Sequence, residues 1–130
     1  MTSLFSVDGQ TYNVIVPTGG LKRSGQILDG QNAGRLQSGR MERDIIGTYY
    51  NYSLTIDTRG LSNAAYDSLY QVLTAPVDYH VITMPYGQGT ITFDAYVSGV
   101  EDQMLSNNGS RTFWGEMTVD FIAMGPQRTP

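Results

Sequence analysis

The chain has 130 residues, of which 40% are hydrophobic and 15% charged, with a formal net charge of −4 and no cysteine. This length suffices for one domain, spanning residues 1–130, and excludes two domains of ordinary size. Without cysteine there are neither disulfides nor thiolate metal sites, and the acidic excess argues against binding nucleic acid through the overall field. The charged fraction lies well below the roughly 25% of an average soluble domain. This favours a surface partly covered by partners over a merely polar one.

The N-terminal part is expected to form strands. Leu4–Val7 and Thr11–Val16 flank Asp8-Gly9, and Asp-Gly between two such segments is a strong hairpin signal because the turn requires positive φ angles. A third strand is expected over Leu21–Leu28, with Leu21 and Ile27 facing inward. The first ten residues show no basic segment followed by an apolar one, so we expect no signal peptide.

Residues 29–44 are the part that the folding of one chain explains least. Glycines and amides interrupt any periodicity, which predicts an extended loop, and loops of this length are uncommon in a compact domain unless functional or disordered. Lys22 to Arg43 carries five cations and two anions, whereas the rest of the chain carries three cations and ten anions. A positive loop on a negative body is suited to steering contacts between copies. Arginines of a solvated loop produce the same pattern.

A long strand and a single helix follow. Thr48–Ile56 alternates strictly, as a half-buried antiparallel strand does. The residues expected to meet the core are Tyr50, Tyr52, Leu54 and Ile56. Ser62 is a suitable N-cap because its hydroxyl can accept a backbone N–H, and apolar residues then recur on one stripe. Pro76 prevents continuation, so the helix is predicted to span Ser62–Thr74 and to pack on the sheet.

Three further strands are predicted over Tyr79–Met84, Thr90–Val100 and Arg111–Met124, with a polar loop over Glu101–Ser110 and a tail over residues 125–130. The residues of the last strand expected to face inward are Phe113, Met117, Val119, Phe121 and Ala123. The order of elements predicts a mainly β fold: an antiparallel β-sandwich or barrel with one flanking α-helix and a long Gly/Arg-rich loop.

No stretch of the sequence assembles a recognisable active site, so we expect neither an enzyme nor a cofactor. His80 is the only histidine and lies in an apolar strand, where a lone histidine is more often structural or surface-facing than catalytic; it has no second ligand for zinc. Asp57, Asp94 and Asp120 can approach one another across a sheet, but paired acid–base catalysis requires convergence in a pocket. The glycine pairs do not open a helix, so no phosphate loop is predicted.

Arg35, Arg40 and Arg43 are the candidates for contacts outside the chain. Phosphate or nucleic acid is one possible ligand, but lysine is nearly absent and no aromatic residue lies between Gly30 and Asp44. We therefore interpret the arginines as donors of forked hydrogen bonds to carboxylates of another subunit. The alternative is pairing within the chain, with Glu42, Asp44 or Asp57.

A family resemblance is carried by the segments AGRLQSGRMERDIIGTYYNYSLTI, LSNAAYDSLYQVL, YHVITMPY, ITFDAYVSGV and FWGEMTVDFIAM. Together they resemble small minor structural proteins encoded among the tail genes of long-tailed bacteriophages and prophages. The shared pattern comprises Ala33-Gly34-Arg35, Gly39, Met41 and Arg43-Asp44-Ile45-Ile46-Gly47, followed by an alternating strand, a helix and three strands. The resemblance extends from Ser3 to Met124.

The resemblance implies a virion protein of the tail tube, the distal tail or the baseplate, found in the virion and, during assembly, in the host cytoplasm. It implies a tail-tube-like fold that forms a homo-oligomeric ring, such as a hexamer, with the long loop reaching the neighbouring subunit. The expected partners are the chain itself and other tail proteins, without a membrane or sequence-specific nucleic acid. The expected subunit-interface residues are Arg35, Arg40, Met41, Arg43 and Asp44.

Two rival hypotheses make different predictions. A carbohydrate-binding module that contacts the host surface requires exposed aromatic residues in a row on one face. The candidates for that row are Tyr49, Tyr86, Tyr96 and Trp114. A small hydrolase requires Asp94 or Asp120 to lie close to another acid.

Overall fold

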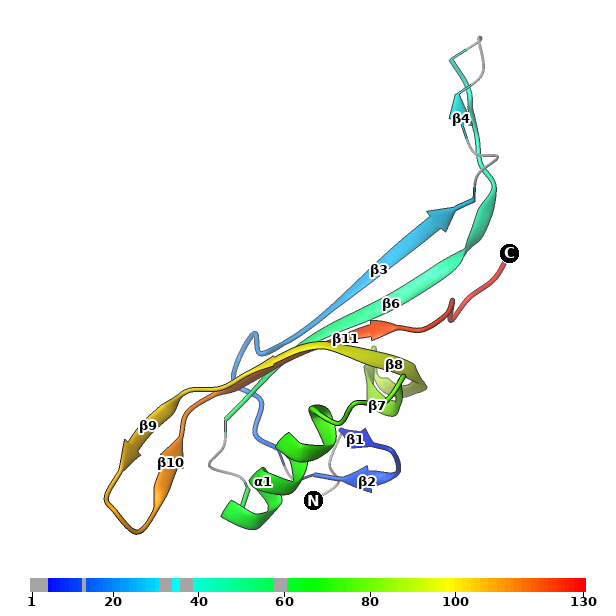
Figure 1. Cartoon of the computed structure of the whole chain (residues 1–130). Helices are drawn as coiled ribbons and strands as arrows, with labels where there is room; N and C mark the ends of the chain where they lie inside the picture. The colour runs from blue at the N-terminus through cyan, green and yellow to red at the C-terminus, as the bar shows by residue number, and fades with distance from the viewer. Residues whose placement is uncertain (1–4, 13, 31–33, 36–38, 58–60) are drawn as a thin grey trace.

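The computed structural model describes residues 5–12, 14–30, 34, 35, 39–57 and 61–130, which form one helix and eleven strands (Figure 1). In chain order the elements are β1 (Ser6–Val7), β2 (Gln10–Thr11), β3 (Leu21–Asp29), β4 (Gly34–Arg35), β5 (Met41–Glu42), β6 (Ile45–Ile56), α1 (Asn63–Leu73), β7 (His80–Tyr86), β8 (Gly89–Glu101), β9 (Met104–Asn107), β10 (Thr112–Trp114) and β11 (Met117–Ala123). Leu4, Asn13 and Ala33, which belong to predicted strands or to the shared pattern, lie outside the described residues.

Seven strands form one antiparallel sheet in the order β2-β1-β7-β8-β11-β6-β3. The prediction of a mainly β fold with one flanking helix is confirmed. In the described part of the chain β2 and β3 stand at opposite edges, so the sheet is not closed into a barrel. An open sheet leaves backbone N–H and C=O groups available at its edges.

The core lies between one face of the sheet and the helix. Alternate residues of β11 are buried along its whole length, because successive side chains of a strand point to opposite faces. The inward residues predicted for β6 and β11 are confirmed, with Tyr50 half-buried. The buried apolar residues are Phe5, Val7, Tyr12, Tyr52, Leu54, Ile56, Tyr66, Leu69, Leu73, Ile82, Met84, Phe93, Ala95, Met117, Val119, Phe121 and Ala123.

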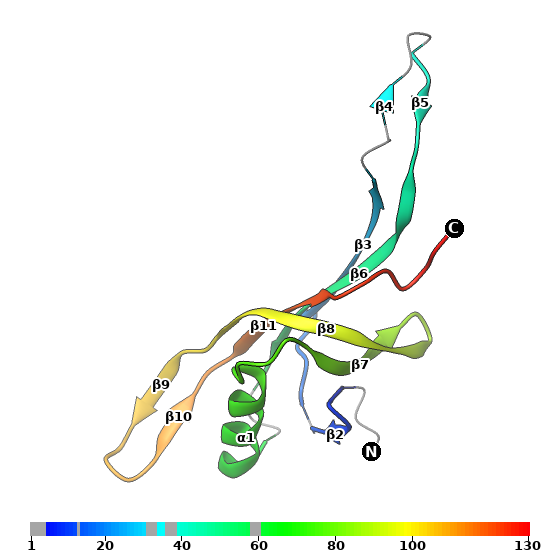
Figure 2. The ribbon, with the colours of Figure 1, turned by 45° about the vertical axis from the view of Figure 1, so that its right-hand side comes forward.

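Helix α1 confirms the predicted boundaries. The Ser62 hydroxyl accepts the backbone N–H of Ala65 at 3.1 Å, which caps the first turn. Tyr66, Leu69 and Leu73 are its buried residues, and Figure 2 shows the helix on one side of the sheet. The stripe of apolar residues therefore covers that face of the sheet.

The N-terminal hairpin is also confirmed. Asp8 and Gly9 have φ angles of 52° and 81°, the left-handed values that a two-residue turn requires. The second strand is shorter than predicted: β2 ends at Thr11, and among the described residues after it Ile15 forms an isolated bridge with Asp57.

The predicted loop over residues 29–44 is instead the outer part of a long β-hairpin. β3 pairs with β6 over its whole length, and beyond them β4 pairs with β5. Figures 1 and 2 show this hairpin extending away from the rest of the sheet. Where the structure describes this outer part, β4 and β5 pair across the hairpin, although no alternation of apolar residues marks it in the sequence. We call residues 27–46 the first arm.

The prediction of a polar loop over residues 101–110 is also wrong, because this segment belongs to a second β-hairpin. β9 pairs with β10, and the Asn108 side-chain oxygen accepts the backbone N–H groups of Ser110 and Arg111 at 3.1 and 2.9 Å in the turn. The predicted last strand is divided into β10 and β11 at residues 115–116. We call residues 103–115 the second arm; Figures 1 and 2 show the two arms leaving the sheet in opposite directions.

Candidate assembly surfaces

The predicted interface residues lie on the first arm, and two of them stabilise it from within. Arg43 donates from Nε and Nη2 to the two carboxylate oxygens of Asp29, both at 3.1 Å, so its forked partner belongs to the same chain. The carbonyl of Asp44 accepts the Gly30 N–H at 2.6 Å. Arg40 is exposed, whereas the side chains of Arg35 and Met41 lie outside the described part of the structure.

The first arm carries apolar side chains that the chain itself does not cover. Ile27 was predicted to face inward but is 52% exposed, because its part of β3 extends beyond the helix and the rest of the core. Leu28, Ile45 and Ile46 are also exposed. A cluster of exposed aliphatic residues on a projecting element is typical of a surface that packs on a partner.

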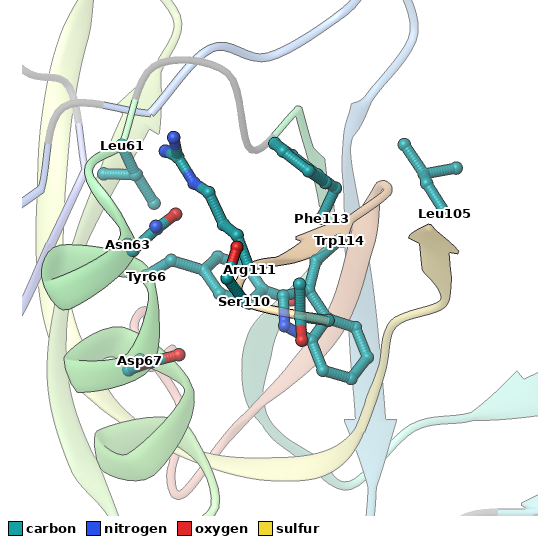
Figure 3. Close-up of a pocket in the computed structure, with 10 residues that line it drawn as sticks. Leu61, Asn63, Tyr66, Asp67, Leu105, Ser110, Arg111, Phe113 and Trp114 are labelled. Carbon is teal, nitrogen blue, oxygen red and sulfur yellow. The ribbon is translucent and has the colours of Figure 1, made fainter. Parts of the chain in front are cut away.

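The second arm has the same character. Leu105 is 71% exposed, and Met104 and Phe113 are also exposed, which corrects the inward orientation predicted for Phe113. Between this arm and α1 lies a groove of about 590 Å³ (Figure 3). Its lining includes Leu61, Asn63, Tyr66, Asp67, Arg111 and Trp114.

The base of the second arm is fixed to the helix by an aromatic contact. The rings of Tyr66 and Trp114 stack with centroids 6.4 Å apart and planes at 24°. The Tyr66 hydroxyl donates a hydrogen bond to the carboxylate of Asp102. Burial, and then the neighbouring Asp102, raises the pKa of Tyr66, so the phenol stays protonated and remains a donor.

A second cluster of aromatic and charged residues lies near the turn between β7 and β8; we call it the basic end. The hydroxyls of Tyr50 and Tyr86 are 3.0 Å apart, and the Arg23 guanidinium lies 5.2 Å from the centre of the Tyr86 ring. The hydrogen bond with Tyr86, and then the guanidinium of Arg128, hold the pKa of Tyr50 below its ordinary value. Arg128 is placed there because its backbone pairs with Thr48 on β6.

The candidate catalytic side chains do not converge on one site. His80 is buried, and its Nδ1 lies 2.7 Å from the Asp8 carboxylate, so it fastens the N-terminal hairpin to β7. Asp94 is paired in register with Val81, and Asp120 with Ser53 and Gly99, not with another acid. Within the described ranges no group of three potential ligands could hold a metal ion.

The row of aromatic residues required by a carbohydrate-binding module is not formed. Tyr86 contacts Tyr50, which shares a face of β6 with buried Tyr52, whereas Tyr49 is on the opposite face of the same strand. Trp114 is half-buried against the core and α1. The four candidates therefore do not present one continuous stacking surface.

The second arm and the basic end were missed by the sequence prediction. The second arm had a signal: Asn108-Gly109 is a hairpin dipeptide, and it lies between Met104-Leu105 and Phe113-Trp114. The basic end had none, because Arg23, Tyr86 and Arg128 are distant in sequence and meet only in the fold.

Comparisons with known proteins leave the function to be argued from the molecule itself. No protein-family model matches the chain, and a search of curated proteins returns no match. In the described part of the chain no helix is long and apolar enough to span a membrane.

Proposed function

We propose that this chain is a structural protein of a bacteriophage tail that assembles with itself into a ring or hub in the tail tube, the distal tail or the baseplate. The observation that carries the proposal is the pair of projecting hairpins with exposed aliphatic residues. Leu105 on one and Ile27 on the other are more than half exposed, although both are large apolar residues. The order of elements agrees with the tail-tube-like fold that the resemblance implies.

The unpaired edges of the sheet are a second feature that supports self-assembly. β3 is nine residues long, stands at one edge and is exposed along most of its length. At the other side β1 pairs with β7 only at Ile82 and Thr83, which leaves the outer edge of β7 beyond Thr83 without a strand in the described part. Unpaired edges invite another strand, and closing a ring removes them. A head-to-tail contact with a neighbour would cover the short Met84–Tyr86 edge of β7 and part of the β3 edge.

The proposal is tested by the mass of the purified chain in solution. We expect oligomers in analytical ultracentrifugation, and rings in electron microscopy, either alone or when other tail proteins are added. A strictly monomeric species at high concentration that also binds no tail protein contradicts the proposal.

The first arm provides the first mutational test. Arg35→Ala and Arg40→Ala are expected to weaken assembly while the monomer stays folded, because surface substitutions usually change stability by no more than about 0.5 kcal/mol. Lys22→Ala on β3, which removes one exposed cation outside the arm, is the matched control. Unchanged oligomer mass in both arginine variants means that these side chains make no contact between subunits.

A further inference from the structure

The basic end holds two positive charges that no carboxylate of the described residues neutralises. Arg23 packs over Tyr86, and Arg128 lies beside the hydroxyl of Tyr50, so both guanidiniums are held next to phenol rings. Among the described residues neither arginine forms an ion pair with a carboxylate, in contrast to Arg43 with Asp29. Two guanidiniums held on one patch, hydrogen-bonded to phenols and paired with no described carboxylate, can still donate to oxygen anions.

The opposite end of the same strand is acidic; we call it the acidic end. β8 begins beside Tyr86 and runs for 13 residues to Glu101. Glu101 pairs in register with Thr118, and the Gly115 N–H donates to the Gln103 carbonyl at 2.7 Å, so Glu116 lies near Gln103, about two residues beyond the position opposite Glu101. Both glutamates are exposed, and within the described part neither forms an ion pair.

The two ends cannot meet within one chain. A strand rises about 3.3 Å per residue, so β8 separates them by roughly 40 Å. The charges are, however, complementary, and they lie at the two ends of one sheet, near the points where Figures 1 and 2 show the arms extending in opposite directions. A contact between the basic end of one copy and the acidic end of the next therefore runs along the strands, whereas pairing of sheet edges runs across them.

We propose that the basic end, Arg23 and Arg128, binds the carboxylates of Glu101 and Glu116 of a second copy of this chain. The inference rests on the proposed function and adds a direction to it. Edge pairing closes a ring, and the contact between charged ends stacks one ring on the next. A head-to-tail contact of this kind does not close on itself, so it extends the assembly into a tube. The contact weakens as salt screens the charges.

The test exchanges the charges. R23E/R128E removes the basic end and E101K/E116K removes the acidic end; all four positions are exposed, so circular dichroism is expected to show both variants folded. In sedimentation each variant alone is expected to lose the species larger than a ring and to keep the ring. An equimolar mixture of the two variants, and the chain with all four substitutions, are expected to recover the larger species.

A matched pair of single variants controls for net charge. R23E and K22E change the charge equally, but neighbouring residues of β3 point to opposite faces of the sheet. R23E is expected to lower the fraction of stacked species and K22E to leave it unchanged.

Each contrary outcome has its own meaning. If the unmodified chain stays monomeric with and without tail proteins, both the proposed function and this inference are wrong. If it forms rings and stacks that the variants leave intact, or if the mixture does not recover them, the inference alone is wrong. If R23E/R128E assembles normally but binds a DNA oligonucleotide more weakly, the arginines serve phosphates and the inference is overturned.

Discussion

Gly47 lies at the closest contact between β6 and the C-terminal segment, and its replacement by alanine is the most informative single perturbation of this fold. A Cβ atom there would lie 2.5 Å from the carbonyl oxygen of Arg128 and 2.5 Å from Cβ of Pro126. Both distances are far below van der Waals contact, and neither neighbour is the flexible end of a side chain. Gly47→Ala therefore has to displace residues 126–128 from β6.

The cost follows from the hydrogen bonds that hold this segment. The Thr48 N–H donates to the Arg128 carbonyl at 2.8 Å, the Gln127 N–H to the Thr48 carbonyl at 2.9 Å, and the Tyr50 N–H to the Gln127 side chain at 2.7 Å. Each such bond contributes about 0.5–1.5 kcal/mol net. Alanine recovers about 0.5–1 kcal/mol relative to glycine in a strand. We expect a net loss of about 1–3 kcal/mol, the usual range for overpacking.

Urea unfolding of Gly47→Ala beside Gly99→Ala measures this difference. Gly99 lies in β8, and a Cβ atom there meets nothing within 4 Å, so this control is expected to keep or slightly raise the free energy of unfolding. Displacing Arg128 also removes half of the basic end, so Gly47→Ala is expected to reduce stacking. Equal stabilities of the two alanine variants would refute the reasoning.

Two further predictions concern the helix and the N-terminal hairpin. Ser62→Ala removes the cap that accepts the Ala65 N–H and is expected to cost about 1 kcal/mol in urea unfolding; an unchanged midpoint contradicts the cap. Partial burial raises the pKa of Asp8, but hydrogen bonds from His80 and the Val81 N–H outweigh it and lower the pKa below 3.8. The stabilisation by the Asp8 carboxylate is therefore present above pH 3.8 and is lost as the pH falls below it. The stability lost on Asp8→Asn is expected to shrink over that range, and a pH-independent difference would exclude this ion pair.

The sheet and helix were predictable because they bury one face. In β6 the alternation that places Leu54 and Ile56 inward is written in the sequence, and Ser62 and Pro76 mark the helix ends. These signals arise wherever an element has one buried face and one solvent-exposed face, and the predicted core agrees with the structure for that reason.

The arms were not predictable by the same rule because their described residues form no buried face within one chain. Ile27 and Phe113 continue an apolar pattern beyond the end of the core, so the inference that apolar means inward is wrong for both. Arg43 was expected to bind a carboxylate of another subunit. In the hairpin Asp29 lies across from Arg43 and accepts its hydrogen bonds, a contact that the loop prediction did not include.

The exposed apolar residues of the arms bear on assembly and not on folding. A residue such as Leu105 contributes little to the stability of the isolated chain while it stays in water. Leu105 gains that contribution only when another surface covers it. We therefore expect the arms to stabilise the proposed assembly without stabilising the fold of the isolated chain. In the proposed assembly, pairing of sheet edges runs across the strands and the contact between charged ends runs along them, so one small sheet provides two independent directions of association. That independence is why we expect the charge exchange to abolish stacking while rings persist.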